Sequence, residues 1–135
     1  MMLSTIGFAA NEQPGFWREA LVQAGVTTIV ETPIGDLCAK AVQAWVVVLA
    51  KTDDPTTHSC WLRSLNAPII VITQRTSALQ RLAPQLPKLA FICHPLRAEL
   101  DLATFLVLAT RRTGGVSVMN APRFYTVMPG VQTCR

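Results

Sequence analysis

Residues 45–50 read Trp-Val-Val-Val-Leu-Ala, an apolar run without a single polar position. A half-exposed strand alternates polar and apolar residues, whereas a run that is apolar on both faces is typical of a central strand in a parallel sheet. Other largely apolar runs lie on either side of it, at residues 3–9, 26–30, 68–73 and 88–93. The chain therefore predicts a buried central strand with four neighbours.

Amphipathic segments separate these runs and follow the last one. Helical spacing or helix-forming composition appears at residues 16–24, 34–43, 58–65, 77–86 and 98–112. Strands that alternate with helices predict a parallel sheet, and right-handed crossovers leave few topologies. We expect an α/β, flavodoxin-like (β/α)5 fold, with a parallel five-stranded sheet in the order 2-1-3-4-5 and helices on both faces.

The length of 135 residues suits one domain. We assign residues 1–113 to this domain and residues 114–135 to a C-terminal extension. Residues 116–119 and 124–128 alternate with turn residues there, so we expect a hairpin or the start of a linker. No apolar run approaches about 18 residues and no basic leader precedes the first one, so we expect a cytoplasmic protein.

The net charge is +4, but the basic residues are scattered along the chain and Arg111–Arg112 is their only adjacent pair. This pattern favours a solvated surface over nucleic-acid binding. The four cysteines include no C-x-x-C spacing, and His58 with Cys60 lacks the further ligands of a zinc site. Phosphate-binding glycine motifs are also missing from the sequence. We therefore expect no metal and no cofactor.

Three landmarks suggest a family. The fourth apolar run ends in Thr73, the fifth is followed by His94–Pro95, and Pro55 lies in the loop after the third. In this order and spacing the chain, over about residues 3–112, resembles the receiver domain of bacterial response regulators in two-component signal transduction. That family has a phosphoryl-binding Thr or Ser, a Lys-Pro pair and a loop proline at these places.

The departures from the family concern its chemistry. Receivers bind Mg²⁺ through two acids after the first strand and are phosphorylated on an Asp ending the third. Here residues 10–12 are Ala-Asn-Glu, and the acceptor position falls on Lys51 by the proline count or on Ala50 by the strand count. His94 stands where the family has the lysine of its Lys-Pro pair. The resemblance thus implies a degenerate phospho-pocket, made of Asn11, Glu12, Lys51, Thr73 and His94.

We therefore expect a pseudo-receiver, which is not an enzyme and acts by dimerisation or partner docking. Such domains often form the N-terminal regulatory module of a transcription regulator or an ATPase, so nucleic acid would be contacted only through another domain. Two alternatives stay open. One is a receiver still phosphorylated on Asp53 or Asp54, which could instead cap the next helix. The other is a small-molecule-binding or enzymatic domain that uses the same strand-end loops.

Two further features have competing interpretations. The Lys51 side chain could pair with Glu12 or Asp53, or it could be solvated. Residues 102–109 read Leu-Ala-Thr-Phe-Leu-Val-Leu-Ala, which is more apolar than one helix on one sheet requires. Large apolar patches usually mark interfaces, so we expect a homodimer or partner contact there, unless residues 116–131 fold back over the helix. The predicted interface residues are Leu102, Phe105, Leu106, Leu108 and Ala109.

Overall fold

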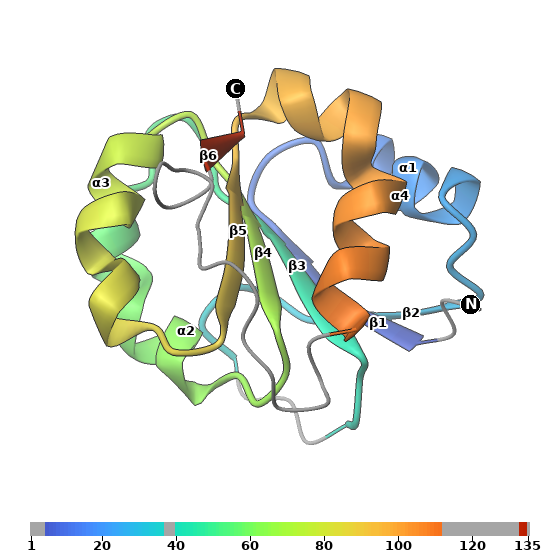
Figure 1. The fold of residues 1–135 in the computed structure, drawn as a ribbon, viewed down its shortest axis with the longest axis horizontal. Coiled ribbons are helices and arrows are strands. Elements are labelled where there is room, and N and C mark those ends of the chain that lie inside the picture. The colour runs from blue at the N-terminus through green and yellow to red at the C-terminus, as the bar shows by residue number, and fades with distance from the viewer. Residues whose placement is uncertain (1–4, 37–39, 112–132, 135) are drawn as a thin grey trace.

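The computed structural model describes residues 5–36, 40–111 and 133–134, which form a sheet with helices on its two sides (Figure 1). The strands are β1 (Thr5–Ala10), β2 (Thr28–Glu31), β3 (Ala44–Val48), β4 (Ile69–Ile72), β5 (Leu89–Cys93) and β6 (Thr133–Cys134). The helices are α1 (Pro14–Gln23), α2 (Ser59–Ser64), α3 (Thr76–Leu82) and α4 (Pro95–Arg111), with short 3₁₀ segments η1 (Pro55–His58) and η2 (Ala83–Gln85).

The sheet has the predicted topology. Its order is β2-β1-β3-β4-β5-β6, and every neighbouring pair is parallel. The run that begins at Trp45 lies at the centre, and all five residues of β3 are buried. The flavodoxin-like order 2-1-3-4-5 is thus confirmed, with two-residue β6 beside β5 as an addition.

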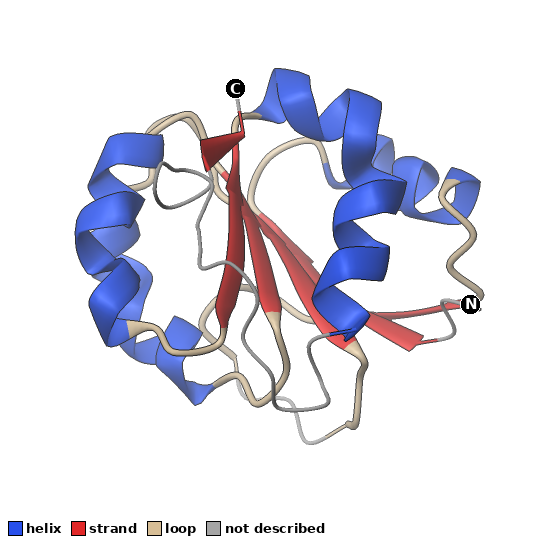
Figure 2. Cartoon of the chain, viewed as in Figure 1, coloured by secondary structure: helices blue, strands red, loops and turns tan. Residues whose placement is uncertain are grey.

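The two faces of the sheet carry separate cores (Figure 2). Alternate residues of β3 point to opposite faces, so Val46 and Val48 pack with α1 and α4, whereas Trp45 and Val47 pack with α2 and α3. Each helix buries apolar residues against one face only. The prediction of helices on both faces is confirmed.

The helix predicted over residues 34–43 is wrong for the described part of that range. Residues 34–36 and 40–43 contain no helix. Gly35 has a φ of +100°, a left-handed conformation that ends helical continuation, and the Asp36 amide closes a turn onto the Pro33 carbonyl at 3.1 Å. Over residues 5–36, 40–111 and 133–134, four α-helices are therefore present where five were predicted.

Two tryptophans cover the sheet near this crossover. A Cβ added to Gly7 of β1 would lie 2.6 Å from the Trp45 ring, so the indole lies directly on the glycine. Trp61 of α2 meets Trp45 edge-on, with 6.3 Å between ring centroids. The Trp61 Nε1 donates a 2.8 Å hydrogen bond to the Asp36 carbonyl and so ties the crossover to α2.

Other boundaries differ by a few residues. The predicted helix over residues 77–86 is divided into α3 and η2, because Pro84 cannot supply an amide hydrogen. The last helix begins at Pro95, earlier than predicted, and is kinked at Asp101, where φ is −124° and ψ is 18°. The possible hairpin at residues 116–128 lies outside the described residues. None of the described helices has the length and apolarity that a membrane span requires.

Candidate functional site

The residues of the predicted phospho-pocket lie on loops at one edge of the sheet. Because β1, β3, β4 and β5 are parallel, the loops that follow them meet at their common carboxyl edge. This is where ligand sites of open α/β folds are found. The contacts of each polar group at this edge decide what the site can do chemically.

Asp53 is turned back over the end of β3. Its Oδ2 accepts a 3.0 Å hydrogen bond from Asn11 Nδ2 and a 2.8 Å bond from the Ala50 amide. The backbone continues the link, since the Asn11 amide donates to the Val48 carbonyl at 3.0 Å. One carboxylate oxygen thus joins the loop after β1 to the loop after β3.

The second oxygen of Asp53 faces His58. The distance from His58 Nε2 to Asp53 Oδ1 is 3.9 Å, and both side chains are about one-fifth exposed, at 19% and 21%. Burial by itself would raise the pKa of Asp53, but the hydrogen bonds from Asn11 and Ala50 and the nearby His58 outweigh burial and lower it. Asp53 is therefore held in its ionised form at neutral pH.

Glu12 joins the same two loops a second time. Its Oε1 accepts a 2.9 Å hydrogen bond from the backbone amide of Lys51. Within the described residues, the Lys51 ammonium makes no ion pair with Glu12 or Asp53, and this side chain is exposed. Of the two interpretations of Lys51, the solvated side chain is therefore the one that the described residues support.

Thr73 is fully buried at the end of β4. Its Oγ1 accepts a 2.9 Å hydrogen bond from the Arg75 amide, which forms a tight turn before α3. Arg75 in turn donates from Nε to the Lys51 carbonyl at 3.3 Å. The hydroxyl predicted to face a phosphoryl group is thus occupied with its own loop.

His94 fixes the start of α4. Its Nδ1 accepts a 3.2 Å hydrogen bond from the Leu96 amide, and its carbonyl accepts from the Arg97 and Ala98 amides at 3.0 Å. The Leu96 amide is one that the first turn of a helix leaves without an intrahelical partner, whereas the bond from Ala98 is the first regular bond of α4. Where a receiver lysine would extend toward the phosphoryl group, this histidine caps a helix.

Asp54 caps the next element, as one alternative predicted. Its Oδ1 accepts a 3.0 Å hydrogen bond from the Thr56 amide at the start of η1. This bond is the main reason that the pKa of Asp54 is lowered. Capping by the two aspartates is therefore confirmed for the loop amides of Ala50 and Thr56.

The pocket does not fit the magnesium ion that receivers bind. Within residues 5–36, 40–111 and 133–134, no three His, Cys, Asp or Glu side chains are grouped to hold a metal. The carboxylates of Glu12 and Asp53 are directed at amide donors, as described above. A hard cation requires several oxygen ligands, and this arrangement does not present them.

The predicted interface on α4 is wrong for three of its five residues. Leu102, Leu106 and Ala109 are buried beneath the helix in the core that α4 shares with α1. Phe105 and Leu108 are half-buried, and the Phe105 ring lies 5.0 Å from that of Phe91. The apolar excess was overestimated because α4 packs on both the sheet and α1.

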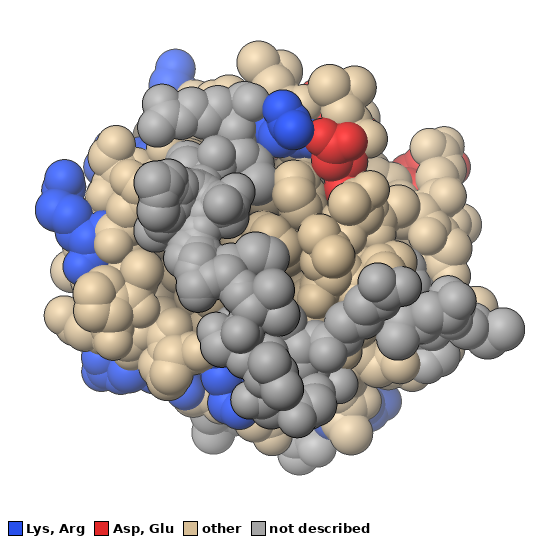
Figure 3. All heavy atoms as spheres, viewed as in Figure 1, with Lys and Arg blue, Asp and Glu red and all other residues tan. Residues whose placement is uncertain are grey.

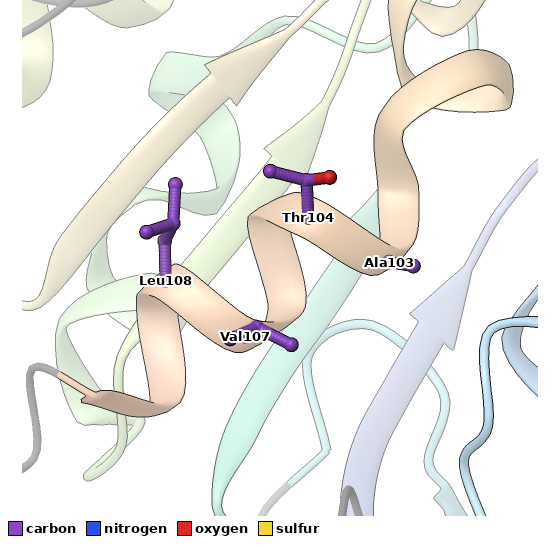
Figure 4. A pocket seen from close by; sticks show the side chains of 4 residues that line it. All are labelled: Ala103, Thr104, Val107 and Leu108. Carbon is purple, nitrogen blue, oxygen red and sulfur yellow. The ribbon is translucent and has the colours of Figure 1, made fainter. Parts of the chain in front are cut away.

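The outer side of α4 has a shallow groove of about 380 Å³, lined by Ala103, Thr104, Val107 and Leu108 (Figure 4). Two exposed leucines that the sequence analysis did not single out lie on the same helix before its kink. Leu96 and Leu100 are 68% and 81% exposed. Their four-residue spacing could have drawn attention to them, but only the structure separates them from the buried leucines.

In comparisons with known proteins, no family model, no curated protein and no solved structure matches the chain.

Proposed function

We propose that this domain is a phosphorylation-independent, receiver-like regulatory domain that acts by protein contact rather than by catalysis. One observation carries the proposal. Four of the five polar positions in the pocket use a side-chain atom to fix a loop or a helix start, and the fifth, Lys51, contributes its backbone to two such bonds.

Phosphoryl transfer to a carboxylate needs a free oxygen, a metal and a cation to stabilise the developing charge. Asp53 Oδ2 already accepts two hydrogen bonds, and a phosphoryl group there would break the links to Asn11 and Ala50. Thr73 is buried and His94 caps α4. The edge that performs chemistry in receivers is here occupied by structural bonds.

Fixed loops favour docking. A surface whose loops are already ordered loses less conformational entropy when a partner binds. The proposal extends to a cytoplasmic N-terminal module of a transcription regulator or an ATPase. The exposed thiol of Cys60, which forms no disulfide, is compatible with a reducing compartment.

The test is intact mass measurement after incubation of the full chain with a small phosphodonor and Mg²⁺. We expect no added phosphoryl mass. An adduct that disappears in Asp53→Asn but persists in Asp54→Asn, or the reverse, would overturn the proposal. These two variants are a matched pair, because each aspartate caps a neighbouring amide and only Asp53 contacts Asn11.

A phosphoryl adduct that is lost only in Asp53→Asn would establish a second candidate function, a receiver phosphorylated on Asp53. It is favoured by the position of this carboxylate over the end of β3, and by the lowered pKa that keeps it ionised. A stoichiometric small molecule retained in native mass spectra would instead support the ligand-binding alternative.

A further inference from the structure

The shortest strand of the sheet brings two cysteines to neighbouring positions. Strand β6 pairs in parallel with β5, and the Cα partners are Ile92 with Thr133 and Cys93 with Cys134. Figure 1 shows β6 beside the end of β5, close to where α4 begins. The two cysteines are 41 residues apart in the chain, so only the fold brings them together.

The spacing of register partners suits a disulfide. Neighbouring strands of a sheet lie about 4.8 Å apart, and the Cα atoms of disulfide-bonded cysteines are about 4.4–6.8 Å apart. Cα partners in neighbouring strands therefore fall within this range, below its most common value of about 5.5–6 Å. A separation below the common value stores strain in the bond and makes it easier to reduce. The register thus favours a reversible disulfide over a permanent one.

Cys93 lies at a junction of the carboxyl edge. Its carbonyl accepts a 2.9 Å hydrogen bond from the Thr73 amide, and the next residue, His94, caps α4. Cys93 is fully buried, so a reagent in solution reaches it only through a local opening. Strand β6 has two residues and lies at the edge of the sheet, and elements with so few contacts open at low cost in free energy. Opening of β6 is therefore the expected route to this pair.

We propose that Cys93 and Cys134 form a reversible disulfide that locks β6 to the end of β5. The oxidant is a low-molecular-weight disulfide such as oxidised glutathione. The Cys134 thiolate attacks one of its sulfur atoms and releases one small thiol, and the Cys93 thiolate then attacks the Cys134 sulfur and releases the second. Two protein thiols are oxidised to one disulfide, one small disulfide is reduced to two thiols, and the protons of the protein thiols pass to them.

The consequence is a redox-dependent position of the last strand. In the reduced form β6 is held by its pairing with β5, whereas in the oxidised form a covalent bond closes a loop that contains α4. Such a crosslink restricts the chain in its unfolded and partly open states. In a reducing compartment the pair is reduced at rest, and it closes when the pool of small disulfides rises. The device uses no phosphoryl group and is independent of the proposed function.

The other described cysteine lacks a cysteine as register partner. Cys60 is exposed in α2, where its Sγ accepts a 3.4 Å contact from Arg63 Nη2. Figure 3 shows the Lys and Arg atoms of the described residues mostly along the margins of this face rather than in one patch. An anionic reagent such as oxidised glutathione is therefore not directed to a single cysteine, and a selective pairing would report the register.

The test is disulfide mapping of the native full chain after incubation with oxidised glutathione. Remaining thiols are blocked with iodoacetamide, and the chain is digested with trypsin without reduction. We expect the peptide of residues 89–97 joined to the peptide of residues 124–135, at least about tenfold in excess of any other pairing, because the sheet raises the effective concentration of these two thiols. Excess reduced glutathione should separate the two peptides.

Two controls accompany the native chain. Cys60→Ser should form the link as the unaltered chain does, whereas Cys134→Ser should form none. The latter changes only a two-residue edge strand, so it leaves the buried Cys93 in place. In chain unfolded by urea, Cys38 and Cys60 are the closest cysteines, 22 residues apart, and should pair most often because shorter loops close at lower entropic cost.

Three results would overturn the proposal. The first is glutathione adducts on the native chain without a link between the two peptides. The second is the same set of pairings in native and urea-unfolded chain, since the fold would then not select the pair. The third is a link that excess reduced glutathione leaves intact, because the disulfide would then be permanent.

Discussion

Asp53 bonds to two loops through a single oxygen, so its removal affects both. Asp53→Ala leaves the Asn11 amide and the partly buried Ala50 amide without their acceptor. We expect the free energy of unfolding to fall by about 1–2 kcal/mol in urea titrations. The matched control is Asp36→Ala, because Asp36 is exposed and bonds Trp61 through its backbone carbonyl. It should change stability by less than about 0.5 kcal/mol, and an equal loss in both variants would contradict this role of Asp53.

The same carboxylate predicts a pH dependence. The pKa of Asp53 lies below its ordinary value of 3.8, so its contribution to stability is present above that value and is lost as the pH falls through the folded pKa. Stability should therefore decline from about pH 4 downward, and less steeply in Asp53→Ala. Asp54 has a lowered pKa too, so part of the slope remains in the variant. Identical slopes would exclude the contribution of Asp53.

Gly7 is required by the indole that lies on it. In Gly7→Ala the new Cβ would meet the Trp45 ring at 2.6 Å, and we expect a loss of about 1–3 kcal/mol in the free energy of unfolding from overpacking. In the control Gly15→Ala, in α1, the nearest atom would be 4.0 Å away, at Arg18 Nη1. That change should be neutral or stabilise by up to about 1 kcal/mol. Denaturant titration of both variants decides the point.

At the scale of single elements, substitutions in α4 test whether it is a core helix or an interface helix. Leu106 is fully buried, so Leu106→Ala should lower the free energy of unfolding by about 2–5 kcal/mol. Thr104 is exposed beside the groove, and Thr104→Ala should cost less than about 0.5 kcal/mol. Thermal unfolding measures both. A Leu106→Ala protein that keeps its stability but changes its oligomeric state would restore the interface interpretation.

The elements also show how far sequence patterns extend. Strands β1, β3, β4 and β5 could be predicted because buried parallel strands are continuous apolar runs, and β3 is buried at every position. The edge strand β2 is not buried, but its β-branched residues made it predictable. Apolar spacing alone could not decide whether residues 34–43 form a helix or a loop, because Ile34 and Val42 pack on the sheet from a loop. The segment that replaces that helix is tied to α2 by the hydrogen bond from Trp61 Nε1 to the Asp36 carbonyl, which joins residues distant in sequence.

For the candidate site, the sequence located the right loops but not the bonds between them. The topology brings Glu12 and Lys51 together, yet the carboxylate bonds the Lys51 amide and not its ammonium. Backbone donors at strand ends are invisible to residue patterns, since every residue except proline carries one.

At the scale of the whole molecule, hydrogen bonds among its own loops close the carboxyl edge of the sheet. Asp53 and Glu12 each join the loop after β1 to the loop after β3. Arg75, which follows β4, is joined to the same region through the Lys51 carbonyl. The loops after three neighbouring strands are therefore linked into one surface.

The sheet separates the three tryptophans into two groups. Trp17 belongs to the core beneath α1 and α4, whereas Trp45 and Trp61 belong to the core beneath α2 and α3. Phe substitution of Trp17, or of the other pair, therefore leaves fluorescence from one core alone. Coincident unfolding curves from the two proteins would mean that both cores melt as one cooperative unit, and separate curves that one side opens first. The chain thus carries an optical reporter on each side of its sheet.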